Sequence, residues 1–194
     1  LLNEEEADRL VNIHWKNGKM TTDLLAQDID VIIEKVGLRE RATENTKFLI
    51  LPTNKAGPNE VVCGEKMSRF LTLYKVKSFS EAIELAIKIQ NYQGAGHSLG
   101  IHTKNEKRAH EIAMLAKTCR VIVNQAHCFA TGGFFNNGLP FSLSMGCGSW
   151  GGNSIDENLN WEHFTNKVRV VQTIEENKPS LEEIFGSYWG ETSQ

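Results

Sequence analysis

The chain has 194 residues, of which 40% are hydrophobic and 23% charged, and its formal net charge at pH 7 is −3. These values are ordinary for a globular domain with its own core, and the slightly acidic balance gives no electrostatic basis for binding nucleic acid or an anionic membrane. No apolar run approaches the roughly 18 residues of a membrane-spanning helix, and the acidic N-terminal segment lacks a signal-peptide pattern. We therefore expect a cytoplasmic protein with neither nucleic acid nor membrane as a partner.

The first third of the chain carries helical and strand patterns. Apolar residues recur at helical spacing in residues 4–16 and 23–36, and Gly37 is placed to end the second helix. The apolar run 48–51 is ended by Pro52 and is typical of a buried strand in a parallel sheet.

The middle of the chain alternates regularly between strands and helices. The predicted elements are a strand at 71–76, a helix at 78–93, a strand at 98–102, a helix at 103–117 and a strand at 120–124. Each of the two helices begins with a Ser/Thr-x-x-Glu capping box. Such alternation predicts an α/β fold with three layers and a mostly parallel sheet, in which ligands bind at the carboxyl ends of strands.

The end of the chain has a different pattern. Residues 167–173 are predicted to form an exposed edge strand, which could pair with another domain or chain. A third capping box, Ser180 to Glu183, predicts a short final helix. We therefore divide the chain into a domain of residues 1–160 and a tail of residues 161–194.

The most unusual segment is GLPFSLSMGCGSWGGNS, residues 138–154. Each glycine costs backbone entropy on folding, so a dense cluster indicates positive φ angles or a main chain lying flush against a ligand or another backbone. Within it, Gly146 to Gly151 matches the dinucleotide-binding pattern G-x-G-x-x-G. The residues that follow are poor helix formers, which disfavours a Rossmann interpretation.

Two other arrangements carry possible chemistry. The run Gly96–Gly100 matches the G-x-S-x-G pattern of α/β serine hydrolases, with Ser98 as nucleophile and Asp156 and His163 following in the expected order. The predicted turn runs from helix into strand, the reverse of a nucleophile elbow. The serine hydrolase and a non-catalytic α/β interaction domain remain the alternative functions.

The histidines and cysteines give weaker signals. None of the cysteines forms a C-x-x-C pair, so we expect no metal site and interpret all four as thiols, mostly buried: Cys63, Cys119, Cys128 and Cys147. His127 could activate the adjacent Cys128, but neighbouring side chains on an extended chain point to opposite sides. His97, between two loop glycines at the entry to a strand, is the histidine with the most restricted direction.

Three motifs together resemble a known family. The motifs Glu65-Lys-Met-Ser68, Gly94-x-Gly-His-Ser98 and the run from Gly138-Leu-Pro through Gly146 to Ser154 are similar to the CoA-acylating aldehyde dehydrogenases of the acetaldehyde, sulfoacetaldehyde and succinate-semialdehyde type. The resemblance implies that residues 1–160 are part of an aldehyde dehydrogenase catalytic domain whose N-terminal part is missing. It also implies that 161–194 hold an oligomerisation strand, at 167–173, and a helical tail, which makes a homo-oligomer the expected assembly.

The resemblance also implies a reaction. In the family a cysteine thiolate attacks a small aldehyde, hydride passes to NAD or NADP, and coenzyme A displaces the acyl group from the resulting thioester. That cysteine would lie upstream of Leu1, so we expect the chain alone to be inactive. Glu65 would bind the nicotinamide ribose hydroxyls and His97 would lie near the reacting centre, whereas the aldehyde entrance would be lined by Asn124, Phe134 and Asn137.

Overall fold

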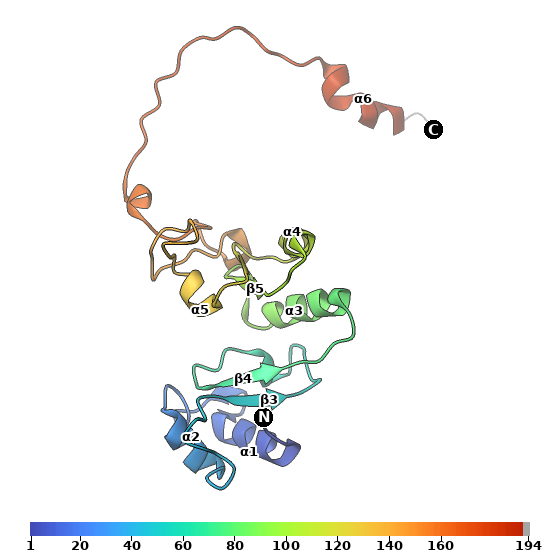
Figure 1. The fold of residues 1–194 in the computed structure, drawn as a ribbon. Helices are drawn as coiled ribbons and strands as arrows, with labels where there is room; N and C mark the ends of the chain where they lie inside the picture. The colour runs from blue at the N-terminus through green and yellow to red at the C-terminus, as the bar shows by residue number, and fades with distance from the viewer. Residues whose placement is uncertain (192–194) are drawn as a thin grey trace. The chain divides into compact units, whose positions relative to one another are not determined.

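The structure of the protein, a computed structural model, describes residues 1–191 (Figure 1). The chain divides into two compact units, Leu1–Asn160 and Trp161–Gln194. The assignment of the first unit to a catalytic domain and of the second to an oligomerisation tail stays a prediction.

The first helix, α1 (Glu4–His14), begins at a capping box that the sequence analysis missed. The Asn3 side chain accepts a hydrogen bond from the Glu6 N–H, and the Glu6 carboxylate accepts one from the Asn3 N–H. The helix ends before residue 16, because β1 (Trp15–Lys16) turns back to pair with β2 (Lys19–Met20). An Asn-Gly turn with positive φ at both residues makes this tight hairpin possible.

The second helix is shorter than predicted. α2 spans Ile29–Val36 and ends at Gly37, whose φ of 73° is the left-handed value expected of a C-terminal cap. Residues 21–28 form turns instead, with Ala26 at a φ of 53°. Leu24 is nevertheless fully buried, so the apolar spacing correctly predicted burial but not helix.

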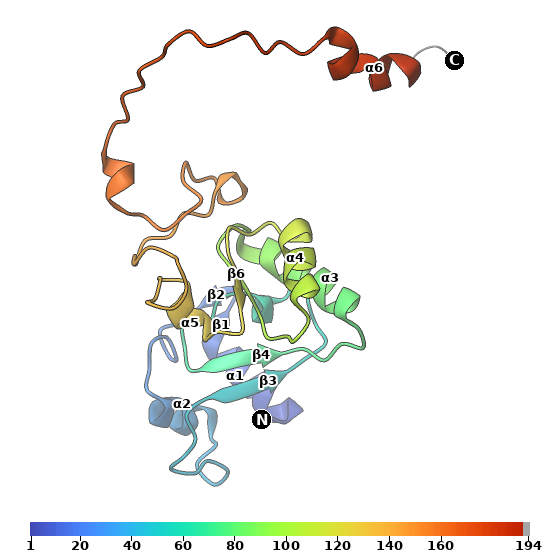
Figure 2. The same cartoon turned by 45° about the horizontal axis from the view of Figure 1, so that its top comes forward.

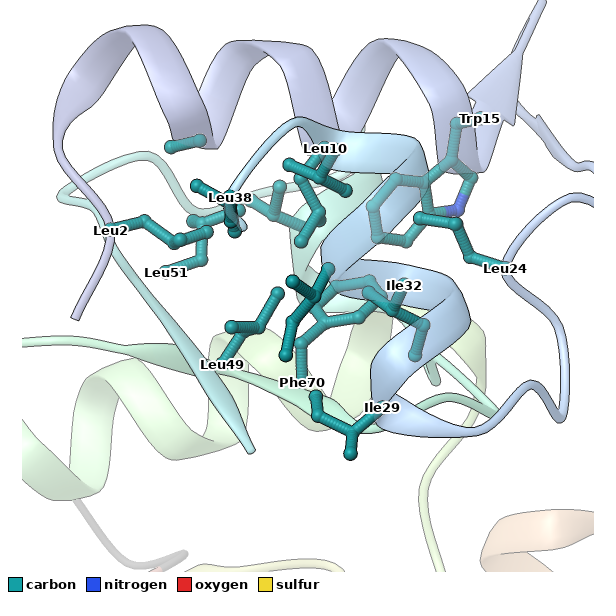
Figure 3. Close-up of a cluster of buried hydrophobic side chains, with 14 residues drawn as sticks. Leu2, Leu10, Trp15, Leu24, Ile29, Ile32, Leu38, Leu49, Leu51 and Phe70 are labelled. Carbon is teal, nitrogen blue, oxygen red and sulfur yellow. The ribbon is translucent and has the colours of Figure 1, made fainter. Parts of the chain in front are cut away.

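A parallel strand pair supports the main apolar core. β3 (Leu49–Pro52) pairs with β4 (Phe70–Leu73), which begins one residue before and ends three residues before the predicted strand 71–76. Fourteen buried side chains from these strands, α1, α2, the adjoining turns and the short helix η1 (Val61–Cys63) form one cluster (Figure 3). Phe70 lies at its centre with 1% of its surface exposed.

The predicted strand–helix alternation is confirmed in the middle of the chain. α3 (Phe79–Gln93), β5 (Leu99–Ile101), α4 (Glu106–Leu115) and β6 (Val121–Val123) follow in order (Figures 1 and 2). β5 and β6 pair in parallel. Ser78 caps α3 as predicted. α4 begins two to three residues later than expected, because the Asn105 side chain rather than that of Thr103 caps it.

The sheet arrangement corrects part of the prediction. Residues 1–191 contain three separate two-stranded sheets, two parallel and one antiparallel, instead of one continuous sheet. The alternation of strands and helices along the chain predicts that the strands are parallel, but it does not predict which strands are neighbours in the sheet. The mixed α/β class is therefore confirmed, whereas the three-layer arrangement stays a prediction.

The second unit has little regular structure. It contains η3 (Trp161–Phe164) and α6 (Leu181–Glu191), the latter capped by Ser180 as the sequence predicted. Residues 167–173 are not paired as a strand in the described chain, and Val168, Val170 and Val171 are each at least 87% exposed. An edge strand needs a partner strand for its hydrogen bonds. Within residues 1–191, no helix combines the length and apolar character needed to cross a membrane.

Candidate functional site

The turn between α3 and β5 fixes the backbone around His97. Gly94 and Gly96 have φ angles of 119° and 110°, a region that other residues rarely adopt. A Cβ atom on Gly96 would lie 2.1 Å from the carbonyl oxygen of Cys147. The Gly96 N–H also donates to the carbonyl oxygen of Lys117, and the Gly96 carbonyl oxygen accepts from the N–H of Cys119, both at 2.8 Å. The direction in which His97 leaves the chain is therefore set by contacts on both sides of the turn.

Two imidazole rings meet the hydroxyl of Ser98. The Ser98 Oγ atom lies 2.6 Å from Nδ1 of His97 and 2.7 Å from Nε2 of His127, at the start of α5 (His127–Ala130). Gly100 leaves space for the second ring, because a Cβ there would lie 2.5 Å from His127 Nδ1. Burial lowers the pKa of His127, and a charge on His97 lowers it further.

These contacts revise two sequence interpretations. Ser98 follows a helix and enters a strand, as the sequence predicted, and its imidazole partners precede Asp156 and His163 in the chain. The site is therefore not built in the order that α/β-hydrolases use. His127 is engaged by Ser98, while the adjacent Cys128 is exposed to solvent. All four cysteines are free thiols, but only Cys63 is buried, so the expectation that most are buried is wrong.

A buried arginine joins the His97 turn to the glycine-rich loop. The guanidinium of Arg120 donates to the carbonyl oxygens of His97 and Gly146, at 3.1 and 2.9 Å, and to the side-chain oxygen of Asn158 at 2.8 Å. Arg120 is 5% exposed and directly precedes β6. A guanidinium offers five donors in fixed directions, which suits it to holding several carbonyl groups in place.

Asn158 extends this network to the loop after β6. Its amide nitrogen donates to the carbonyl oxygens of Thr131 and Pro140, at 2.9 and 2.8 Å, and the residue is fully buried. Arg120 and Asn158 thus connect the His97 turn, the 125–140 loop and the glycine-rich segment. We call this pair the Arg120–Asn158 network; it was not predicted from the sequence, because no motif includes either residue.

The glycine-rich segment uses its glycines as predicted, for close approach between main chains. A Cβ on Gly146 would lie 2.2 Å from the carbonyl oxygen of Ile155, and Gly148 has a φ of 60°. Only the 3₁₀ turn η2 (Ser149–Gly151) follows, with no α-helix to receive a pyrophosphate. The Rossmann interpretation of this segment is therefore excluded for the described geometry.

The predicted aldehyde entrance contains a cavity of about 480 Å³. Its lining includes two of the three predicted residues, Asn124 and Phe134. Asn137 instead holds the loop together, since its amide nitrogen donates to Gln125 and to the carbonyl oxygen of Ala130. Its volume falls in the range of small-ligand pockets, and it is lined mainly by apolar side chains.

Glu65 has an anchored main chain and an exposed carboxylate. Its N–H donates to the side-chain oxygen of Gln93, at the end of α3 and four residues before His97. The neighbouring ammonium of Lys66 donates to the carbonyl oxygens of Val62 and Gly64, which fixes the turn leading into Glu65. Burial lowers the pKa of Lys66 to about 8.

The predicted site residues are therefore only partly brought together. The cavity lined by Asn124 and Phe134 includes neither Glu65 nor His97 in its walls. Their convergence on one pocket, which the family resemblance implies, stays a prediction. Among residues 1–191, no three His, Cys, Asp or Glu side chains are grouped so that they could hold a metal ion.

Comparisons with known proteins agree with the family resemblance of the three sequence motifs. No protein-family model matches the chain. The chain is 42% identical over 190 residues to the acylating sulfoacetaldehyde dehydrogenase of Cupriavidus necator, covering 97% of the chain and 38% of that protein. It is 38% identical over 184 residues to the acetylating succinate-semialdehyde dehydrogenase of Clostridium kluyveri, covering 94% of the chain and 40% of that protein.

A solved structure gives the same result for the fold. The crystal structure of an acetylating aldehyde dehydrogenase from Geobacillus thermoglucosidasius matches with a TM-score of 0.81 and 30% identity. The match covers 92% of the present chain and 39% of the Geobacillus enzyme chain. The chain thus spans about two fifths of the length of each of these three proteins. It is homologous to one part of the acylating aldehyde dehydrogenases.

Proposed function

We propose that the chain is part of an enzyme that converts an aldehyde, coenzyme A and NAD(P)⁺ to an acyl-CoA and NAD(P)H. The observation that carries this proposal is the match of 97% of the chain to an acylating sulfoacetaldehyde dehydrogenase at 42% identity. Relatives named for sulfoacetaldehyde and succinate semialdehyde make aldehydes with an anionic end group the first substrates to test.

Glu65 is the residue we assign to the nicotinamide nucleotide. Its carboxylate is exposed, and its main chain is held by Gln93. An exposed carboxylate on a fixed turn suits the two hydroxyls of a ribose, because it can accept a hydrogen bond from each. When bound, the nucleotide would supply the hydride acceptor. NAD and NADP both fit this assignment.

His97 is the residue we assign to proton transfer. Its Nδ1 atom is engaged by the Ser98 hydroxyl, whereas its ring is exposed, so Nε2 is the nitrogen available to a substrate. A positioned imidazole of this kind could accept the proton that a thiol loses when it attacks an acyl group. The cavity lined by Asn124 and Phe134 would receive the aldehyde.

The nucleophile is assigned to none of the four cysteines of this chain, so the isolated chain is expected to be inactive. We also assign residues 167–173 to a strand that pairs between subunits of a cytoplasmic homo-oligomer, because three exposed valines, Val168, Val170 and Val171, lie within four residues there. Val170→Asp would then reduce the oligomer size measured by light scattering, and an unchanged size would contradict the assignment.

An exchange enzyme tests the proposed function. In it, the segment of the Cupriavidus necator dehydrogenase that matches this chain is replaced by the chain itself, and the unmodified dehydrogenase is the control. We expect coenzyme A-dependent reduction of NAD⁺ or NADP⁺ with at least one of sulfoacetaldehyde, succinate semialdehyde and acetaldehyde. A folded exchange enzyme that is inactive with all three, or activity of the isolated 194-residue chain, would contradict the proposal.

A further inference from the structure

The hydroxyl of Ser98 has one proton but lies within hydrogen-bond distance of two imidazole nitrogens. His97 Nδ1 is 2.6 Å away and His127 Nε2 is 2.7 Å away. A hydroxyl can donate one hydrogen bond and accept others. When Ser98 donates to one imidazole, the other must therefore donate to Ser98, so the proton positions on the two rings are coupled.

Two proton orders satisfy both contacts when the rings are neutral and Ser98 donates its own proton to one of them. In the first, His97 donates from Nδ1 to Ser98, and Ser98 donates to Nε2 of His127. In the second, every donor and acceptor is reversed, so that His97 accepts at Nδ1 and carries its own proton on Nε2. The two orders leave opposite states at Nε2 of His97, which is the nitrogen free to meet a substrate.

The two orders respond differently when His97 gains a second proton and becomes charged. An imidazolium carries protons on both nitrogens, so a charged His97 can only donate to Ser98. Ser98 is then free to donate its own proton to Nε2 of His127. The first order reaches this state by adding a proton at Nε2 and moving no other hydrogen, whereas the second requires the hydroxyl and both rings to rearrange.

The surroundings of His127 suit it to the accepting end. Its ring occupies the space beside Gly100, where a Cβ would lie 2.5 Å from Nδ1, so the position of the ring is restricted. Burial and the adjacent His97 both lower the pKa of His127, which keeps this ring neutral with a nitrogen able to accept. Arg120 fixes the other end by binding the carbonyl oxygen of His97 at 3.1 Å.

We propose that Ser98 and His127 are positioning residues that keep the proton of neutral His97 on Nδ1 and leave Nε2 to gain and lose a proton. The catalytic meaning of this relay rests on the proposed function, in which His97 accepts a proton from a thiol. Its existence does not, because the proton positions are a property of the chain alone.

Nitrogen-15 NMR of the histidine rings in the 194-residue chain tests the relay directly. The spectra are recorded at a pH at which the rings are neutral, and the exposed His110 of α4 serves as an internal reference. We expect His97 to be mainly in its Nδ1–H form. Ser98→Ala should shift the majority to the Nε2–H form, and Ser98→Thr, which keeps a hydroxyl, should restore the original form.

His127→Phe separates a relay from simple packing. This variant keeps an aromatic ring of similar size but removes the accepting nitrogen. The Ser98 hydroxyl is then free to donate to His97, so the majority form of His97 should shift to Nε2–H. His127→Gln supplies an amide oxygen that can accept, and it should retain the Nδ1–H form. The backbone amide spectrum of each variant establishes that it is folded.

Either of two results would overturn the relay: an Nε2–H majority at His97 in the unmodified chain, or no shift in folded Ser98→Ala and His127→Phe. These results are independent of the exchange enzyme. An inactive exchange enzyme combined with the expected shifts would reject the proposed function and leave the relay intact. An active exchange enzyme without the shifts would do the reverse.

Discussion

Residues 1–76 and residues 94–160 are held together by different forces. The first region buries fourteen apolar side chains in one cluster around Phe70. The second apolar cluster has three buried members, Ile83, Ile112 and Ala116, two of which lie in residues 94–160. There the loops are held mainly by the Arg120–Asn158 network and by glycines that allow main chains to touch.

The difference explains where the candidate site lies. Apolar packing is not directional and tolerates exchanges of similar volume, whereas hydrogen bonds fix particular atoms at particular angles. His97, Ser98 and His127 belong to the second region, where a guanidinium and an amide set the positions of several loops. A site that needs defined atom positions benefits from this kind of support.

The largest expected effect is in the apolar region. Phe70→Ala should reduce the free energy of unfolding by about 4 kcal/mol, because it removes a large buried ring and leaves a cavity. Urea unfolding measured by circular dichroism checks this value. The neighbouring Leu71 is 56% exposed, so Leu71→Ala is the matched control and should change stability by less than about 1 kcal/mol. Equal losses in the two variants would show that this core is not where the structure places it.

A smaller loss of stability is expected in the polar region. Asn158→Ala should cost about 2–3 kcal/mol, since it leaves the carbonyl groups of buried Thr131 and half-buried Pro140, and one guanidinium N–H, without a partner. It should also increase amide hydrogen exchange at residues 131–146 more than in residues 1–76. Asn136→Ala, at an exposed position of the same loop, is the control. Uniformly faster exchange along the chain would contradict the separate support of the two regions.

The smallest effect concerns pH. Burial lowers the pKa of Lys66 from 10.5 to about 8, so between these values the unfolded chain binds more protons than the folded one. Stability should therefore rise with pH from about 8 to 10, by about 1 kcal/mol once screening at a half-buried site is allowed for. Above pH 10 the raised pKa of Tyr74 makes the folded chain bind more protons than the unfolded one, so this group lowers stability as the pH rises.

Lys66→Met is the comparison that isolates this contribution. The difference in unfolding free energy between the unmodified chain and the variant should change with pH across the same interval. A difference that stays constant from pH 8 to 10 would mean that the Lys66 ammonium is not desolvated in the folded chain.

The sequence predicted the two regions unequally well. Apolar spacing located the buried faces of α1 and α2, and a regular alternation gave the parallel pair of β5 and β6. Apolar spacing wrongly predicted a helix at residues 23–28, where Leu24 is buried in a turn. Burial alone does not distinguish the two, because both can place the same side chain in a core.

The polar contacts of the site were much less predictable. Glycine density correctly indicated close main-chain contacts in residues 138–154, but it gave no indication of their partners. Arg120 and Asn158 are 38 residues apart, and nothing local marks them as a pair. Likewise, His127 was considered only with its neighbour Cys128, whereas its partner Ser98 is 29 residues away. Such pairs depend on the tertiary fold.

Coenzyme A-dependent reduction of NAD(P)⁺ by the exchange enzyme carrying His97→Ala measures the contribution of His97 to the reaction. We expect a rate at least about 100-fold lower than that of the exchange enzyme itself, because proton transfer at His97 is lost. His102→Ala, at an exposed position just beyond β5, should leave the rate within a few-fold. Equal rates for the two variants would contradict the assignment of the reacting centre to His97.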